Sequence, residues 1–272
     1  MRQDKAQRLK LACAFHFSGF PIRHSKAAKL AAAAGFDGLE ISPWIPTVMS
    51  EYAARELKAS LRRNSLEFSG FTAIYPPEIV LAARSSAARK RSIQYTNHLI
   101  ELAHELEGRS LVWGSPRSRN IPSDVPLKRG YAWLVQLLKI SGSLAEERGV
   151  KIAIEPINRF ESKIIHTARE ALSLAKRTNR KSVGIVYDVF HVSLEEDSFV
   201  APIMLAGKKL AAVHVSDCNR RIPGKGHIDF RPIFRALRSV GYDGYVTLEA
   251  TLSRDLLRDL TAARRHLESS MQ

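Results

Sequence analysis

The sequence predicts an α/β protein folded as a (β/α)8 barrel, the TIM-barrel architecture, with residues 1–272 forming a single domain. Short apolar runs alternate with helical stretches about eight times, as expected when parallel strands are covered by helices. The chain length of 272 residues suits one such barrel, which needs about 250 residues. A doubly wound open sheet is the rival architecture, but no glycine-rich dinucleotide-binding motif follows the first apolar run.

The order of the elements follows from the alternation of apolar runs and helical segments. We expect strands at residues 11–15, 38–42, 66–71, 110–113, 151–155, 183–188, 211–216 and 245–249. We expect helices at residues 25–34, 51–63, 85–107, 127–148, 167–177, 199–206, 230–240 and 253–269. Gly35, Gly108 and Gly149 are candidate helix C-caps, and Thr167 is a candidate N-cap.

Composition excludes several classes of protein. Hydrophobic residues make up 45% and charged residues 25% of the chain, which is ordinary globular composition. No apolar run reaches 18 residues, so we expect no membrane span. Cys13 and Cys218 are too few for a disulfide framework or a cysteine zinc site. We expect a cytoplasmic protein, because His16 interrupts the apolar stretch near the N-terminus and no clear cleavage pattern follows.

The formal net charge of +15 is first a signal for a nucleic-acid partner. However, Lys and Arg are spread over nearly every expected helix, without a stripe interleaved with aromatic residues. This distribution is typical of a solvated basic surface and disfavours a nucleic-acid partner.

Four of the expected strands carry a polar residue at or near their carboxyl end. Glu155 ends KIAIE, Asp188 ends VGIVYD, His214 lies in AAVHVSD, and Glu249 lies in YVTLEA. Active sites of such barrels lie at the carboxyl ends of the strands, so we expect these side chains to converge. Three converging carboxylates repel one another unless a cation neutralises them. Three oxygen ligands and one nitrogen ligand favour a single Mn²⁺, with Mg²⁺ or Co²⁺ as alternatives.

Residues at two other strand ends also lead toward this site. Glu40 ends the second strand and is a candidate hydrogen-bond partner near the metal. Trp113 ends the fourth strand and is either a wall of the substrate pocket or a core aromatic residue. Arg117 and Arg119 follow it, and on a loop above the metal they would favour a substrate with a phosphate or carboxylate group. The alternative is that this loop only faces solvent.

Four stretches resemble the motifs of one enzyme superfamily: IEPINRFES, YDVFHVS, HVSDCNRRIPGKGHIDF and VTLEA. They are similar to the xylose-isomerase-like sugar isomerases and epimerases, in particular the ketose 3-epimerases, and the similarity is concentrated between Glu155 and Glu249. The resemblance implies that the four strand-end residues are the metal ligands. It also implies that Glu161, His191 and Arg220 hold the oxygens of the substrate.

The resemblance implies epimerisation of a ketose, or of a related sugar acid or phosphate, at C3 through an enediolate. A metal that binds the carbonyl and a neighbouring hydroxyl would acidify the C3 proton. Glu155 and Glu249 on opposite faces would then exchange that proton with inversion. By analogy we expect a homodimer or homotetramer.

Other functions stay open at this point. An aldose–ketose isomerase of the hydroxypyruvate isomerase type, or a keto-inositol dehydratase, would use the same metal and carboxylates. A barrel that only binds a sugar is disfavoured because both glutamates are present. An abasic-site nuclease of the endonuclease IV type would suit the positive charge, but it needs extra histidines near strands three and four for a three-metal site. The sequences FTAIYPP and VWGSP supply none there.

Overall fold

A computed structural model describes residues 8–18, 22–44 and 49–272 of the chain. Eight strands close into a barrel in chain order, and all neighbouring pairs, including β1 with β8, are parallel. This confirms the predicted (β/α)8 fold, and each strand lies within one residue of its expected bounds. The strands are β1 (Lys10–Ala14), β2 (Gly38–Ile41), β3 (Glu67–Phe71), β4 (Ser110–Trp113), β5 (Lys151–Ile154), β6 (Val183–Asp188), β7 (Leu210–Val215) and β8 (Tyr245–Leu248).

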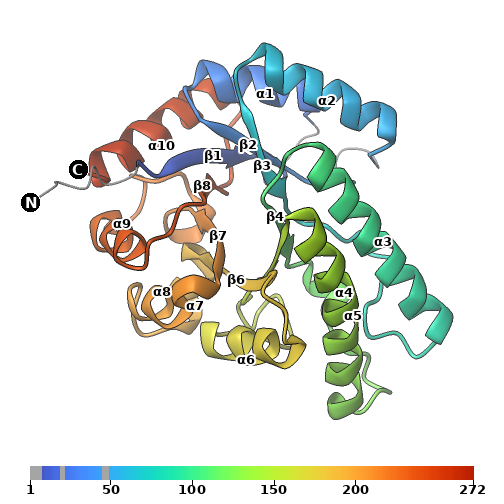
Figure 1. Cartoon of the computed structure of the whole chain (residues 1–272). Coiled ribbons are helices and arrows are strands. Elements are labelled where there is room, and N and C mark those ends of the chain that lie inside the picture. Colours follow the sequence, from blue (N-terminus) through green and yellow to red (C-terminus); the bar gives the residue numbers. More distant parts are fainter. Residues whose placement is uncertain (1–7, 19–21, 45–48) are drawn as a thin grey trace, which may run out of the picture.

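The helices surround the barrel, as Figure 1 shows. Those that match the expected segments are α1 (His24–Ala33), α2 (Glu51–Arg63), α3 (Ser86–Glu105), α5 (Leu127–Arg148), α6 (Ala168–Thr178), α8 (Ala201–Ala206), α9 (Phe230–Ser239) and α10 (Leu256–Ser270). None of these helices in the described residues is long and apolar enough to cross a membrane.

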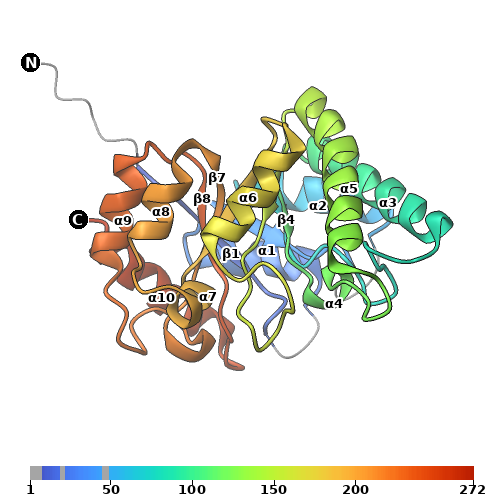
Figure 2. The ribbon, with the colours of Figure 1, turned by 90° about the horizontal axis from the view of Figure 1, so that it is seen from below.

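Two short helices were not predicted, so the expected number of eight was wrong for the described residues. They are α4 (Pro116–Arg119) after β4 and α7 (Val189–Glu195) after β6. Two 3₁₀ turns, η1 (Gly207–Lys209) and η2 (Cys218–Arg220), flank β7. Figure 2 shows α4 and α7 at the same end of the barrel, beyond the carboxyl ends of the strands. These insertions therefore add residues to the face on which the site was expected.

The helix caps follow the predictions with one exception. Thr167 caps α6 in a capping box with Glu170, and Gly149 ends α5 with a φ of 68°. Gly35 has a φ of 84° directly after the C-cap of α1. The prediction for Gly108 was wrong, because α3 ends earlier and Glu107 takes the left-handed conformation, with a φ of 63°.

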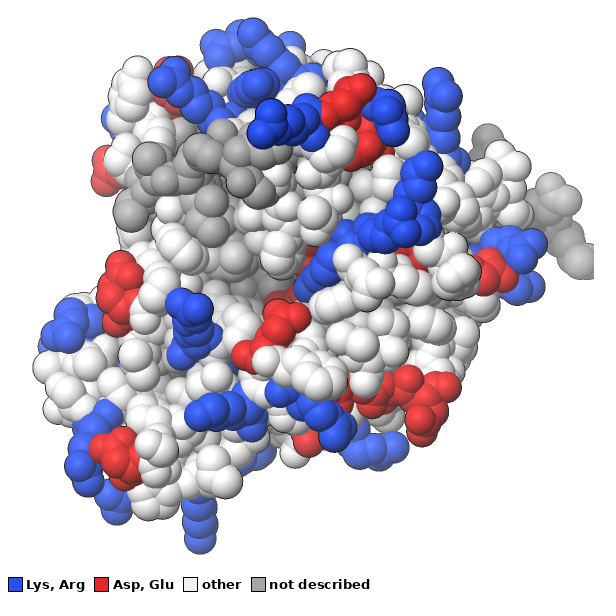
Figure 3. Space-filling view, turned by 180° about the vertical axis from the view of Figure 1, so that it is seen from behind, with Lys and Arg blue, Asp and Glu red and all other residues white. Residues whose placement is uncertain are grey.

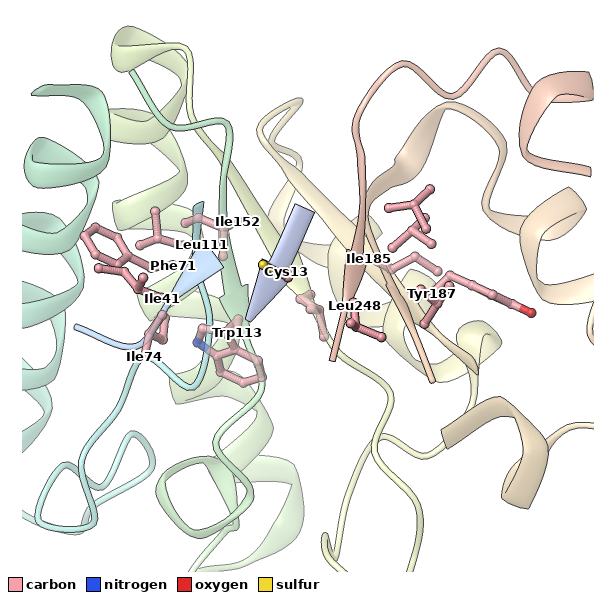
Figure 4. Close-up of a cluster of buried hydrophobic side chains, with 14 of the residues drawn as sticks. Cys13, Ile41, Phe71, Ile74, Leu111, Trp113, Ile152, Ile185, Tyr187 and Leu248 are labelled. Carbon is pink, nitrogen blue, oxygen red and sulfur yellow. The ribbon is translucent and has the colours of Figure 1, made fainter. Parts of the chain in front are cut away.

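The core has two parts. The larger one lies between the strands and the helices; Figure 4 shows Ile41, Phe71 and Leu111 in one region of it and Ile185 and Leu248 in another. The smaller cluster consists of the side chains Val112, Ala153, Val186 and Ala212, which come from four consecutive strands. Since side chains alternate between the two faces of a strand, residues two positions further along these strands also point into the barrel. Those positions are the carboxyl ends of the strands, where the site lies.

Candidate metal centre

The four predicted ligands come together at the carboxyl end of the barrel. Glu155, Asp188 and His214 each lie two residues after a member of the inner cluster, so all three point inward. The sheet register pairs Asp188 with His214 directly. Glu249 follows β8 and completes the group. One ligand atom from each of the four residues lies within 4.8 Å of the other three.

The site is almost closed to solvent. The exposed fractions are 6% for Glu155, 1% for Asp188, 0% for His214 and 3% for Glu249. Among the described residues, the Nδ1 atom of His214 has no hydrogen-bond partner, and it lies 3.3 Å from Glu249 Oε1 and 3.7 Å from Glu155 Oε1. A buried imidazole nitrogen directed at carboxylate oxygens provides a donor set that fits a divalent cation.

Basic side chains also contact the carboxylates. Arg220 Nη1 lies 2.8 Å from Asp188 Oδ2 and 2.5 Å from Glu249 Oε2. His16 Nε2, from the segment after β1, lies 3.1 Å from Glu249 Oε1. The Arg220 guanidinium offsets part of the charge of the three buried acids, and both Arg220 and His16 lie beside the predicted ligands.

The surroundings drive the acid strengths of the two glutamates in opposite directions. Burial raises the pKa of Glu155 to about 8, and the neighbouring Glu249 carboxylate adds to this effect. Burial would also raise the pKa of Glu249, but His214 and Arg220 outweigh it and hold that pKa well below its usual range. The two carboxyl groups therefore differ in how readily they hold a proton.

Residues behind the ligands fix their orientation. Glu40 Oε1 lies 2.8 Å from His214 Nε2, on the ring nitrogen opposite the cluster, and Thr247 donates a hydrogen bond of 3.2 Å to Glu40 Oε2. Glu40 is 1% exposed, and it reaches the four-residue cluster through His214. The prediction of Glu40 as a hydrogen-bond partner near the ligands therefore fits better than a direct contact with the substrate. Gly114 provides room for Glu155, because a Cβ there would overlap the Glu155 carboxylate.

The loop after β7 presents Arg220 to the site. Asn219 and Arg220 both have left-handed backbone conformations, with φ angles of 57° and 58°. Asp217 holds this loop by accepting hydrogen bonds from the backbone N–H groups of Cys218 at 2.9 Å and Gly224 at 3.0 Å, among others. Strained backbone of this kind persists only where surrounding contacts maintain it, and here it directs a guanidinium at two metal-site carboxylates.

The remaining predicted substrate residues form a chain of contacts that starts at Arg220. Arg220 Nη2 lies 3.0 Å from His191 Nε2, and Asn158 Nδ2 lies 2.9 Å from His191 Nδ1. Asn158 also donates a 2.8 Å hydrogen bond to Glu161 Oε1. The rings of Phe17 and Phe190 lie 4.9 Å and 4.5 Å from the Arg220 guanidinium. The three residues are thus connected, with Glu161 at the exposed end.

The region after β4 differs from the prediction. Arg119 does not face the site, because it is 0% exposed and donates to the backbone carbonyls of Glu155, Ile164 and Ile165. Arg119 therefore holds the two ends of the loop after β5 together through hydrogen bonds. Arg117 is exposed on α4, and Trp113 is 0% exposed in the core, where Figure 4 shows it near Ile74. Trp113 is therefore a core aromatic residue rather than a wall of the substrate pocket.

Three residues of the site were not identified from the sequence. His16 lies two residues after β1, and the strand-end argument that identified the ligands would also have identified it. Asn158 lies within the IEPINRFES stretch, but an asparagine in a loop gives no signal of its own. Asp217 supports a loop whose conformation the sequence does not reveal.

Comparison with known proteins agrees with this geometry. The sequence profile of the family described as "Xylose isomerase-like TIM barrel" matches residues 28–270. A D-psicose 3-epimerase from Ruminiclostridium cellulolyticum is 31% identical over 229 residues, covering 82% of this chain and 75% of that protein. A 3-dehydro-D-guloside 4-epimerase from Escherichia coli is 27% identical over 224 residues, covering 80% of this chain and 83% of that protein.

Solved structures show the same fold. The structure of D-psicose 3-epimerase with D-tagatose from Clostridium cellulolyticum H10 superposes with a TM-score of 0.86 at 24% identity, and it covers 97% of this chain and 100% of that chain. The relatives named above are epimerases, and the chain accordingly is an enzyme of the isomerase class. By the extent of the profile match and the similarity over 82% of this chain, the chain belongs to the xylose isomerase-like TIM barrel family.

Proposed function

We propose that this protein is a divalent-metal-dependent sugar epimerase that inverts C3 of a ketose. The observation that carries the proposal is the convergence of Glu155, Asp188, His214 and Glu249, whose ligand atoms lie within 4.8 Å of one another. The similarity to ketose 3-epimerases over most of both chains supports the reaction type. The site is buried at the carboxyl end of a barrel, where enzymes of this fold carry out their chemistry.

The four converging residues would hold one metal ion. Three carboxylates and one imidazole favour Mn²⁺, with Mg²⁺ and Co²⁺ as alternatives. When bound, such an ion stabilises negative charge that develops on a carbonyl oxygen of the substrate. Glu40 fixes the orientation of His214 through the 2.8 Å contact to its far nitrogen.

Glu155 and Glu249 are the proposed acid–base pair. They follow β5 and β8, so they approach the substrate from different sides of the barrel. If one carboxylate removes the proton next to the carbonyl and the other carboxyl group returns a proton to the opposite face, the carbon is inverted. Their opposite protonation preferences, with the pKa of Glu155 raised to about 8 and that of Glu249 lowered, suit this exchange.

We propose that Arg220 and His191 bind substrate hydroxyl or carbonyl oxygens beside the ligands, and that Glu161 does so from the exposed end of their hydrogen-bond chain. Arg220 is 9% exposed, so its guanidinium donates in a nearly dry environment where charge-assisted hydrogen bonds are strong, and His191, 3% exposed, lies beside it. The Phe17 and Phe190 rings beside the guanidinium limit the positions that the Arg220 side chain can take.

The substrate is proposed to be an uncharged ketose. The argument for an anionic substrate rested on Arg117 and Arg119 together, and Arg119 is buried in backbone contacts. Arg117 is exposed on α4, and its contact with an anionic group of a substrate stays a prediction.

A second candidate is epimerisation at C4 of a 3-keto sugar, favoured by the similarity to the Escherichia coli 4-epimerase. The chemistry is the same, since in both cases a proton next to a ketone is exchanged. An aldose–ketose isomerase or a dehydratase would also use the site, but neither is among the relatives named above.

The test is incubation of the purified, Mn²⁺-loaded protein with ketoses and 3-keto glycosides in D₂O, followed by NMR of the products. The proposal predicts inverted product with deuterium at C3 of a ketose. Deuterium only at C4 of a 3-keto sugar would favour the second candidate, and deuterium at C1 or C2 would contradict both. Glu155→Gln and Glu249→Gln should each lower turnover by about 10²–10⁴-fold, whereas Lys90→Gln on the exposed surface of α3 should leave it unchanged.

The proposal includes three further points. A small sugar is the proposed partner, and nucleic acid is not proposed. Figure 3 shows Lys and Arg scattered among acidic side chains on the face that it draws. In the described residues, one group of four side chains could hold a metal ion. A homodimer or homotetramer is proposed by analogy. A cytoplasmic location is proposed because Cys13 and Cys218 are free thiols.

A further inference from the structure

We propose that the amino-terminal mouth of the barrel binds a phosphorylated small polyol, at a site separate from the metal centre. A cavity of about 330 Å³ lies there. Its lining includes the first residues of four strands, Ser110, Lys151, Leu210 and Tyr245, so it opens at the end of the barrel opposite the ligands. The volume is at the lower end of the range for small-molecule sites, about 300–1,000 Å³. This inference does not depend on the proposed function.

The cavity exists because the barrel is lined there by small side chains. Barrel interiors are usually filled by layers of bulky branched residues. Here Ser69, Ser110, Gly184 and Ala212 line the space, from four different strands. A Cβ at Gly184 would overlap the backbone carbonyl of Lys209, so the close approach of the chain just before β7 requires glycine at this position. The lumen is therefore left open from the amino-terminal side.

The mouth of the cavity carries an excess of positive charge, with five basic residues against one acidic residue, Asp243. Its five basic residues are Arg109, Lys151, Lys181, Lys208 and Lys209. None of them forms an ion pair with a carboxylate among the described residues, whereas Arg148 on the neighbouring α5 binds Glu101 at 2.7 Å. Instead, Lys209 Nζ donates to the backbone carbonyls of Arg180 and Val183 at 2.8 and 2.9 Å. Five cations around a single carboxylate leave an excess of positive charge that favours the binding of an anion.

The deep end of the cavity is lined by acidic and hydroxyl side chains instead of basic ones. Glu40 lies at that end, where its other contacts are Thr247 and His214. Ser69, which is 2% exposed, also lines the cavity, and its hydroxyl has no hydrogen-bond partner in the part of the chain that the structure describes. The negative charge of Glu40 would repel an anion, but carboxylate and hydroxyl groups both bind sugar hydroxyls.

These two ends define the ligand and its orientation. The phosphate lies at the mouth among the basic side chains, and the polyol part extends inward toward Ser69 and Glu40. The inner cluster that includes Val112, Ala153 and Val186 lies between this cavity and the metal ligands along the strands. A ligand bound here therefore does not enter the metal centre.

The experiment is isothermal titration of the full-length, metal-loaded protein with ribose 5-phosphate, inorganic phosphate and ribose at constant ionic strength. Lys181→Gln/Lys208→Gln removes two exposed cations from the mouth, and neither side chain makes a described contact that the fold would lose. Lys90→Gln/Lys139→Gln is the matched control, with the same change of charge on α3 and α5. We expect saturable binding of ribose 5-phosphate that the first pair weakens by at least about tenfold and the control pair leaves unchanged.

Three results would overturn the proposal: no saturable binding of ribose 5-phosphate, equal weakening by both variant pairs, or binding that survives Lys181→Gln/Lys208→Gln. The last result would also arise if the probe bound only at the metal centre, which these substitutions leave intact. Inorganic phosphate binding as tightly as ribose 5-phosphate would refute the polyol part of the assignment. Failure of this site would leave epimerase activity in the D₂O assay unaffected, so the two proposals are tested separately.

Discussion

The buried guanidinium of Arg119 gives the sharpest prediction for stability. The side chain is 0% exposed, and in the described residues it has no carboxylate within ion-pair distance. It donates to the Glu155 carbonyl, to Ser162 Oγ at 3.3 Å, and to the carbonyls of Ile164 and Ile165, both at 3.2 Å. Burial lowers the pKa of Arg119 to about 10, which reflects the cost of placing this cation in the interior. Replacing Arg119 with methionine removes the cation and all of these hydrogen bonds.

The expected loss follows from these contacts. Hydrogen bonds to a charged group contribute about 1.5–3 kcal/mol each, so four acceptors would give at least about 6 kcal/mol. Removing the cation recovers several kcal/mol of its desolvation cost. Two of the carbonyls also keep another donor, because Ser162 Oγ binds the Ile164 carbonyl and Ile157 N–H binds the Ile165 carbonyl. Arg119→Met should therefore lower the free energy of unfolding by about 2–4 kcal/mol.

Denaturant unfolding followed by circular dichroism measures this change. Arg117→Met is the matched control, since Arg117 lies on the same short helix but is exposed, and it should alter stability by less than about 0.5 kcal/mol. Arg119→Met should also lower turnover at saturating substrate, because the Arg119 side chain holds the backbone of Glu155. Equal stability of the two variants would refute the reasoning.

Two further substitutions test the residues that support the site. Glu40→Gln should weaken Mn²⁺ binding by about 10–100-fold in a calorimetric titration, because it removes the charged partner of His214; unchanged affinity would contradict that role. Asp217→Ala should raise KM more than it lowers kcat, because the loop that presents Arg220 loses the acceptor of several backbone N–H groups. A variant with wild-type KM would show that the loop holds its conformation without Asp217.

The barrel and the convergence of four strand-end residues could be predicted from the sequence because both depend on local patterns. Strand period and strand order place Glu155, Asp188, His214 and Glu249 inward at one end without any knowledge of loops. The same argument, applied to the first strand, would have added His16.

The loops could not be predicted in the same way. The helix α4 has only four residues and α7 only seven, too few to show a helical period. Arg119 lies in PRSRN, which is typical of a basic surface loop, and its burial depends on carbonyls up to 46 residues further along the chain. The conformation of Arg220, with a φ of 58°, is likewise set by contacts of Asp217 and Thr251 rather than by its own sequence.

The most direct test of the central claim is the count of divalent ions bound per chain. Elemental analysis and titration with Mn²⁺ should give one tightly bound ion, with affinity reduced at least about 100-fold in Asp188→Asn and unchanged in Asp197→Asn, an exposed residue beyond α7. A protein that binds no divalent ion, or that binds it equally well in both variants, would contradict the account.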